Sequence, residues 1–354
     1  MMQPTIRVNL DSLVANWRLV ARACPGASIA AVVKADAYGM GADRIAPSLA
    51  HAGCRRFYVA WPSEGARLRS ILGQGADIVV LLGADEEDYQ LMREAELEPV
   101  LNSPAQAGAW MRTAGTDKPY SVHVDTGMNR LGASPSDWAE MSAIAPAPVS
   151  VISHLASADD PASEQNSLQL RGFQTAAHLW PAARRSLSAS AGAWLGRDFC
   201  FDEIRAGIGL YGAGPAPRSG PAPACVATFS ASILQTRTLE TGDQAGYGGT
   251  FTAPSRMRIG TLGVGYADGF PRSASNRANV VIRGERRPVV GRVSMDLTLI
   301  DITGLPAKEG DEAELFGPSL PIEDQAQAMG TIGYELLTRI GPRCRKVYVD
   351  ALPE

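Results

Sequence analysis

The chain has 354 residues, of which 45% are hydrophobic and 20% are charged, a balance typical of a soluble globular protein with about two domains. The net charge of −4 gives no electrostatic reason to expect nucleic acid or an anionic membrane as a partner. No segment approaches the ~18 apolar residues of a membrane helix. The N-terminal residues lack the pattern of a signal peptide, so we expect a cytoplasmic protein.

The cysteines give no sign of a metal site or of a disulfide framework. Cys24, Cys54, Cys200, Cys225 and Cys344 lie far apart in the sequence, and no CxxC pair is present. The four histidines do not complete a recognised spacing of zinc ligands. We therefore expect no metal, and free, mostly buried thiols.

The N-terminal part of the chain alternates short apolar runs with segments of helical length. Eight runs predict strands, at residues 27–33, 56–61, 77–82, 98–102, 120–125, 149–155, 184–190 and 202–209. Helices are expected between them, at residues 42–52, 63–72, 103–113, 136–145 and 163–180, with Ser63, Ser103 and Ser136 as capping residues. Alternating strands and helices form parallel βαβ units. Eight such units predict a closed (β/α)₈ barrel of the TIM type.

A second domain is predicted after the barrel. Residues 213–224 are rich in proline and are typical of a linker. Segments such as MRIGTLGVGYA (257–267) then resemble β-strands joined by glycine-rich turns, with one helix around residues 323–338. We therefore expect a barrel domain over residues 1–222 and a mostly β C-terminal domain over residues 223–354.

Lys34 is the first candidate for chemistry, because it ends an apolar run and precedes a glycine-containing loop. Barrels place their active sites at the carboxyl ends of the strands. A partly enclosed lysine there has a lowered pKa, which suits a nucleophile that forms a Schiff base. Taken alone, a lysine at a strand end is more often a solvated cap.

Other polar residues end later strands at the same rim. Arg130 and His154 follow or end the fifth and sixth strands, while Ser190 and Arg205 follow or end the seventh and eighth. Each alone fits a structural role. Ser190 and Gly207-Ile208, however, fall in the two loops where barrels commonly bind phosphate. A lysine for an aldehyde, a phosphate cradle and an arginine near a ring nitrogen together indicate pyridoxal phosphate.

Two glycine-rich segments have simpler interpretations. Residues 207–212 match the G-x-G-x-x-G pattern, but a dinucleotide site needs a following helix, and here the proline-rich linker follows. Tyr247 lies in GYGGTF (246–251), a pattern that normally indicates a turn with an aromatic lid.

The chain resembles the alanine racemase family, pyridoxal-phosphate enzymes of fold type III, over essentially its whole length. The resemblance rests on seven ordered motifs: AVVKADAYGMG (31–41), HVDTGMNRLG (123–132), ISHLASAD (152–159), IRAGIGLYG (204–212), GYGGTF (246–251), GYADGF (265–270) and VGRVSMDLTLID (290–301). It implies an isomerase that interconverts L-alanine and D-alanine and supplies D-alanine for peptidoglycan. It also implies that the first strand of the chain packs with the second domain.

The resemblance implies a role for each matched residue. Lys34 and Tyr247 would be the two bases, one on each face of the Schiff base between alanine and the cofactor. Arg130 and Met295 would contact the substrate. Tyr247 and Met295 would reach the site of a partner subunit, which makes a homodimer the functional unit. Contacts to the cofactor are implied for seven residues: Lys34, Tyr38, His154, Ser190, Arg205, Gly207 and Ile208.

Three positions depart from the family pattern. Ser188-Ala189-Ser190-Ala191 stands where the family usually has Ala-Asn-Ser-Ala. Gly341-Pro342-Arg343 replaces a form with a tyrosine that contacts the phosphate, so no residue is assigned to that contact. His123 stands where many members have a carbamylated lysine that orients the arginine matched by Arg130. Because an imidazole has no primary amine, His123 either orients Arg130 itself or with a bound anion, or is a buried histidine with a backbone partner.

The sequence leaves three alternative functions open. A racemase for other amino acids, or for a broader set of them, would share the same motifs. A non-catalytic carrier of pyridoxal phosphate resembles the barrel alone, and residues 223–354 with Tyr247 argue against it. A metal-dependent aldolase of related fold would need a His/Cys cluster that the sequence lacks.

Overall fold

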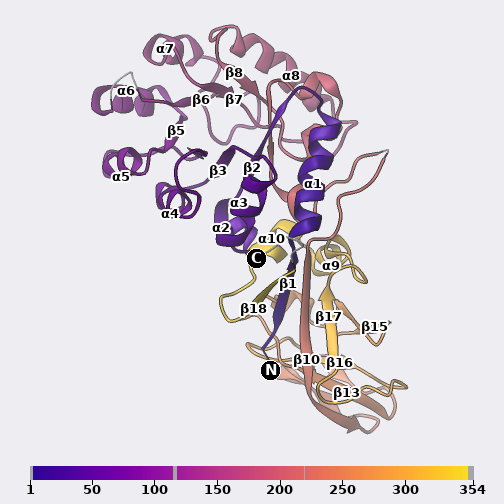
Figure 1. Ribbon diagram of the computed structural model, residues 1–354. Helices are drawn as coiled ribbons and strands as arrows, with labels where there is room; N and C mark the ends of the chain where they lie inside the picture. Colours follow the sequence, from indigo (N-terminus) through magenta and orange to yellow (C-terminus); the bar gives the residue numbers. More distant parts are fainter. Residues whose placement is uncertain (1–2, 115–117, 219, 350–354) are drawn as a thin grey trace.

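The computed structural model describes residues 3–114, 118–218 and 220–349, and a ring of parallel strands forms its N-terminal part (Figure 1). The strands follow the order β8-β7-β6-β5-β4-β3-β2-β9. Between β8 and β9 the ring is joined by a bridge that pairs Ala189 with Arg205, whose backbone N–H donates to Ser188 O at 3.0 Å. The eight strands are β2 Ser28–Val32, β3 Arg56–Val59, β4 Asp77–Val80, β5 Glu98–Leu101, β6 Ser121–His123, β7 Ser150–Ile152, β8 Arg184–Ser186 and β9 Glu203–Ala206. The predicted TIM-type barrel is confirmed.

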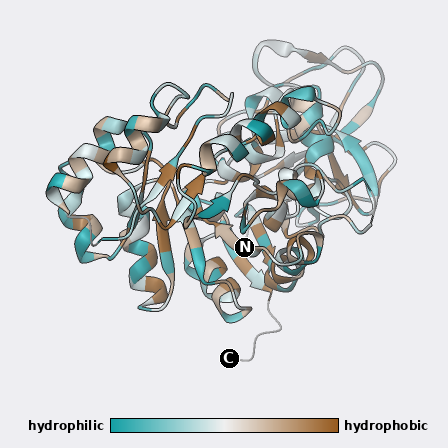
Figure 2. Cartoon of the chain, turned by 90° about the horizontal axis from the view of Figure 1, so that it is seen from above, coloured by the Kyte–Doolittle hydropathy of each residue, from teal (hydrophilic) through white to brown (hydrophobic). Residues whose placement is uncertain are grey.

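Helices cover the outside of this ring and carry many hydrophilic residues, whereas most strands of the ring are hydrophobic (Figure 2). The five helices expected from the sequence are present as α3, α4, α6, α7 and α8, and three further helices, α1, α2 and α5, were not among those expected. The helices of the barrel are α1 Leu10–Ala23, α2 Lys34–Tyr38, α3 Ala42–His51, α4 Pro62–Leu72, α5 Tyr89–Glu94, α6 Pro104–Thr113, α7 Trp138–Ile144 and α8 Glu164–Ala177.

Only one of the three expected capping serines caps a helix. Ser103 accepts a hydrogen bond from the backbone N–H of Gln106 at 3.2 Å at the start of α6. The expectation is wrong for Ser63, because Pro62 occupies the first helical position and the N-cap is Trp61. It is also wrong for Ser136, which lies in the turn before α7, whose N-cap is Asp137.

The second domain is a mostly β structure that also includes the first strand of the chain (Figure 1). β1 (Thr5–Asn9) pairs antiparallel with β10 and parallel with β18. The boundary between residues 222 and 223 stays a prediction. The other strands are β10 Ala227–Leu239, β11 Gln244–Ala245, β12 Phe251–Thr252, β13 Met257–Leu262, β14 Asn279–Ile282, β15 Glu285–Pro288, β16 Thr298–Asp301, β17 Glu312–Phe316 and β18 Arg345–Val349.

Two helices occur where one was expected around residues 323–338. They are α9 (Ile322–Met329) and α10 (Gly333–Thr338). Gly330 ends α9 with a φ of 71°, a left-handed conformation that glycine adopts without a side-chain clash. No helix within the described ranges is long and apolar enough to cross a membrane.

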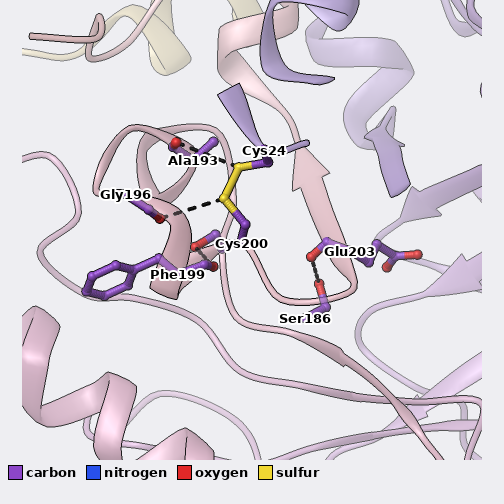
Figure 3. Close-up of a disulfide and its surroundings, with 8 residues drawn as sticks. Cys24, Ser186, Ala193, Gly196, Phe199, Cys200 and Glu203 are labelled. Carbon is purple, nitrogen blue, oxygen red and sulfur yellow. Dashed lines mark hydrogen bonds between the residues drawn. A yellow bond between two sulfur atoms is a disulfide. The ribbon is translucent and has the colours of Figure 1, made fainter. Parts of the chain in front are cut away.

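Cys24 and Cys200 form a disulfide, so the expectation of free thiols is wrong for these two residues (Figure 3). They lie 176 positions apart in the sequence, yet their Cα atoms are 5.6 Å apart. The fold brings the end of α1 beside the segment between β8 and β9, which sequence spacing does not reveal. Cys54, Cys225 and Cys344 are free, and Cys225 is exposed.

We expect the Cys200→Ala variant to lose about 2–4 kcal/mol of unfolding free energy, because a disulfide restricts the unfolded chain. Urea unfolding with and without a dithiol reductant measures this loss. The reductant should destabilise the wild-type protein and the Cys225→Ala control, and leave Cys200→Ala unchanged. Equal stability of the wild-type protein in both buffers would contradict the prediction.

Candidate active site

A cavity of about 860 Å³ opens at the carboxyl ends of the barrel strands. The fold brings together there most of the residues predicted from the sequence, and His123 also lines the cavity. Tyr247 and Met295 belong to the second domain and are not part of the lining. The predicted residues in the lining are Lys34, Tyr38, Arg130, His154, Ser190, Arg205, Gly207 and Ile208.

Lys34 precedes an unusual turn. The four residues Ala35–Tyr38 have φ angles of 53–55°, the left-handed helical conformation. This conformation costs roughly 1–2 kcal/mol for each residue other than glycine, so the surroundings must hold it in place. Gly39 continues the turn with a φ of 80°, and a Cβ atom there would lie 2.6 Å from Leu337 O.

Two carboxylates hold this turn. The Oε1 atom of Glu64 accepts a hydrogen bond from the backbone N–H of Ala35 at 2.7 Å. Asp36 accepts one from Ala42 N at 3.0 Å and forms an ion pair with Lys346 of β18 at 2.8 Å. The second domain therefore supports the segment that presents Lys34.

Lys34 is largely enclosed, and its pKa is lowered. Burial is the main cause and the charge of Arg130 adds to it, while Glu64 acts in the opposite direction. A lowered pKa increases the fraction of neutral amine, which is the form that attacks carbonyl carbon or accepts a proton.

Ser190, Gly207 and Tyr38 form a cradle of small groups and hydrogen-bond donors. The Ser190 hydroxyl accepts hydrogen bonds from the backbone N–H groups of Gly207 at 2.9 Å and Gly209 at 3.1 Å. A Cβ atom on Gly207 would lie 2.6 Å from the Tyr38 hydroxyl oxygen. Burial raises the pKa of Tyr38, so its hydroxyl stays neutral and can donate. Because the Ser190 oxygen accepts both N–H groups, its own hydroxyl proton can be donated, and together with the Tyr38 hydroxyl it suits an anion such as phosphate.

Tyr334 is a further tyrosine in the cavity that sequence reasoning missed. It lies on α10, and the centre of its ring is 6.3 Å from that of Tyr38. Burial raises its pKa to about 12, and the charges of Glu323 and Asp159 add to the effect. The family resemblance implies such a tyrosine near Arg343, which instead binds Asp268 and Asp296. Tyr334 lies within the helix expected around residues 323–338, but nothing in the local pattern indicates that its side chain reaches the cavity.

Arg205 is 3% exposed, and backbone oxygens fix its orientation. Nη1 donates to Ser186 O at 2.6 Å and to Ser186 Oγ at 2.7 Å. Nη2 donates to the carbonyl oxygens of Ser153 and Leu187. Within the described ranges, Nε is the guanidinium nitrogen without a partner, so its N–H remains available to a ligand in the cavity.

His154 lies beside Arg205, with Nδ1 at 3.4 Å from Nη2. Burial and the charge of Arg205 lower its pKa to about 3. The ring is therefore neutral near pH 7. Because a guanidinium only donates hydrogen bonds, Nδ1 is the acceptor and the ring proton is on Nε2.

His123 has a partner that neither sequence interpretation named. Its Nδ1 lies 2.8 Å from Asn102 Oδ1, and Asn102 Nδ2 is fixed by Val100 O at 2.8 Å and Leu81 O at 3.2 Å. Burial lowers the pKa of His123 to about 3, with Arg205 adding to the effect. The expectation of a backbone partner for His123 is wrong, because its partner is the side chain of Asn102. Among the residues that the structure describes, His123 forms no direct hydrogen bond with Arg130.

A carboxylate shapes the loop that presents Arg130. Asp125 accepts hydrogen bonds from the backbone N–H groups of Gly127 and Met128, both at 2.9 Å, and of Asn129 at 3.0 Å from Oδ2. Arg130 follows and is exposed at the cavity.

Tyr247 and Met295 project from the second domain. Tyr247 is 72% exposed and Met295 is 52% exposed. Tyr266 and Leu297 are also exposed and lie close to Met295, since Ala267 N donates to Met295 O and Ser294 N donates to Leu297 O. Exposed apolar side chains gathered in this way often mark an interface.

Known proteins resemble the chain over nearly its full length. The family model "Alanine racemase, N-terminal domain" matches residues 8–215, and "Alanine racemase, C-terminal domain" matches residues 226–348. An alanine racemase of Methylobacterium sp. (strain 4-46) is 43% identical over 356 residues, covering 98% of this chain and 97% of that protein. The chain belongs to the alanine racemase family.

Solved structures of alanine racemases agree with this membership. The enzyme of Bartonella henselae, described with covalently bound pyridoxal phosphate, superposes with a TM-score of 0.93 at 33% identity, covering 99% of this chain and all of that one. The biosynthetic alanine racemase of Pseudomonas aeruginosa gives a TM-score of 0.91 at 34% identity, with 99% and 100% covered.

The buried histidines predict a specific pH dependence of stability. The folded pKa of His154 is about 3, whereas an unfolded histidine titrates near 6.5. Below about pH 6.5 the unfolded state gains a proton that the folded state does not bind, so stability falls by up to ~1.4 kcal/mol per pH unit for each such group.

His154→Asn should flatten this fall, and urea unfolding between pH 7 and pH 5 would measure it. His178→Asn, at an exposed position, is the control. A wild-type slope in His154→Asn would contradict the assignment.

Proposed function

We propose that the protein is a pyridoxal-phosphate-dependent alanine racemase that moves the Cα proton between the two faces of alanine. The observation that carries the proposal is the lysine with a lowered pKa at the same cavity as the hydroxyl groups of Ser190 and Tyr38, beside the small residue Gly207. Membership of the alanine racemase family supports the substrate.

The residues of the cavity fit pyridoxal phosphate. A volume of about 860 Å³ is within the range of cofactor sites. Lys34 would bind the aldehyde carbon, and the free Nε–H of Arg205 would face the ring nitrogen, with His154 beside the ring. When bound, the cofactor withdraws electrons from Cα of an attached amino acid and acidifies its proton. The phosphate would be held by Tyr38, Ser190, Gly207, Ile208 and Tyr334.

Lys34 is the base on one face. Its neutral amine would accept the Cα proton of the substrate, and its ammonium would return one. Arg205 keeps its proton and only donates, so it would leave the ring nitrogen of a bound cofactor unprotonated. The cofactor would then withdraw electrons less strongly, which would limit side reactions such as transamination. Arg130 at the mouth of the cavity would bind the carboxylate of the substrate.

Tyr247 is the base on the opposite face, and we infer that it comes from a second copy of the chain. It is 72% exposed and does not line the cavity of its own chain. Met295, exposed on the same domain, would reach the substrate in the same way. The active unit is therefore a homodimer with shared sites.

A cytoplasmic location is also part of this proposal, and it rests on membership of the alanine racemase family. Because disulfides are uncommon in reducing compartments, the Cys24–Cys200 disulfide would be an exception there.

Lys34→Ala should purify without the visible absorbance of a lysine-linked cofactor and should not racemise alanine, because among the described residues Lys34 is the lysine that lines the cavity. Absorbance spectra, borohydride reduction and the rate of D-alanine formation test this. A variant with the wild-type spectrum and near-normal turnover would remove Lys34 from the mechanism.

The shared site predicts complementation between two inactive variants. Lys34→Ala and Tyr247→Phe homodimers should each be nearly inactive, because each site lacks one of the two bases. After dissociation and random reassembly about half of the dimers are heterodimers, and each contains one intact site. Recovery should therefore be roughly a quarter of wild-type activity per chain.

Subunit exchange must be shown independently, for instance with an affinity tag on one variant. A mixture that exchanges subunits and stays as inactive as its parents would mean that Tyr247 serves its own chain.

A further inference from the structure

We propose that Glu64 is a positioning residue for Lys34: its carboxylate holds the left-handed turn that follows the lysine and so sets where the amine meets the cofactor. The inference rests on the proposed function. It concerns a residue that lies outside the cavity lining and that the sequence motifs did not single out.

The carboxylate of Glu64 lies between the ends of two neighbouring strands, β2 and β3. Glu64 is the third residue of α4, and its Oε1 accepts the backbone N–H of Ala35 at 2.7 Å. Its Oε2 accepts the N–H groups of Ala60 at 2.8 Å and Trp61 at 3.2 Å, directly after β3. The same side chain thus joins the residue after Lys34 to the end of the neighbouring strand.

The turn needs such a partner because its backbone is strained. Ala35, Asp36, Ala37 and Tyr38 all have positive φ, and each could adopt the more stable right-handed conformation if released. Glu64 holds the first N–H of the turn, while Asp36 ties its centre to Ala42 N and Lys346. Release of Ala35 would let the backbone at Lys34 rotate and turn the side chain away from the cradle.

Glu64 also acts on Lys34 through its charge. Three charged or titratable groups from different elements affect or face the amine: Glu64 on α4, Arg130 after β6 and His154 after β7. Arg130 favours the neutral amine, Glu64 favours the ammonium, and His154 is neutral near pH 7. Removing the charge of Glu64 should therefore shift the reactivity of Lys34 to lower pH.

The test uses the full-length protein, stripped of cofactor and then mixed with pyridoxal phosphate. The dissociation constant comes from the visible absorbance band. The rate of borohydride-trapped attachment to Lys34 is measured as a function of pH. We expect Glu64→Gln and Glu64→Ala to weaken cofactor binding about tenfold to a hundredfold, the usual effect of losing a hydrogen bond to a charged group. The pH midpoint of attachment should fall in both.

Glu140→Gln is the matched control. Glu140 is also the third residue of a barrel helix, α7, but it is exposed and distant in sequence from the Lys34 turn. Its removal should leave both the dissociation constant and the pH profile at wild-type values.

A rescue separates positioning from simple capping of α4. Glycine adopts positive φ without the side-chain cost, and the Ala35 side chain is exposed. Ala35→Gly added to Glu64→Ala should therefore restore part of the lost cofactor affinity. If Glu64 only stabilised α4, this second change would restore nothing.

The outcomes distinguish this inference from the proposed function. Wild-type affinity and an unshifted pH profile in Glu64→Gln and Glu64→Ala would overturn the positioning role, whatever their melting temperatures. Capture of pyridoxal phosphate by Lys34→Ala with an unchanged spectrum would overturn the proposed function instead.

Discussion

The left-handed turn after Lys34 is the constraint on which the site depends. Four consecutive residues with positive φ are unstable in isolation, so they persist only because other elements hold them. Glu64 holds the turn from α4, and Lys346 holds it from the second domain through Asp36. The barrel alone therefore does not fix the position of Lys34. The strained turn Ala35–Tyr38 links β2, α4 and β18, and all three elements help to set where the Lys34 amine lies.

The second domain consequently has two tasks. Toward its own barrel it supports the Lys34 turn, and Leu337 O approaches Gly39 so closely that a side chain at position 39 would clash. Away from its own barrel it exposes Tyr247 and Met295, which in the proposed mechanism complete the site of another copy. β1 strengthens this arrangement, because it pairs with β10 and β18 before the chain enters α1 and the barrel.

Much of the fold could be predicted because most barrel strands are buried and appear as apolar runs, although β8 begins with two exposed arginines. Because barrel sites lie at the carboxyl ends of the strands, the sequence also predicted that Lys34, Ser190 and Arg205 lie at the same end of the barrel. Some errors are local, such as the helix caps expected at Ser63 and Ser136, and the others concern tertiary contacts. Cys24 and Cys200 meet only after the barrel closes, and His123 bonds to Asn102 of a neighbouring strand. Neither contact has a signature in local sequence spacing.

The charge of Arg205 is compensated from the floor of the barrel. Burial lowers its pKa, while Tyr58 and the carboxylate of Glu203, two residues earlier on β9, oppose this effect. Glu203 in turn receives the Tyr58 hydroxyl at 2.5 Å and faces Arg56 at 3.3 Å, which pairs with Glu98 at 2.6 Å. Two buried arginines are thus balanced by two buried carboxylates. An unpaired guanidinium in this interior would carry a large desolvation cost, so this layer beneath the cavity permits Arg205 to remain a charged donor toward the ring nitrogen of the cofactor.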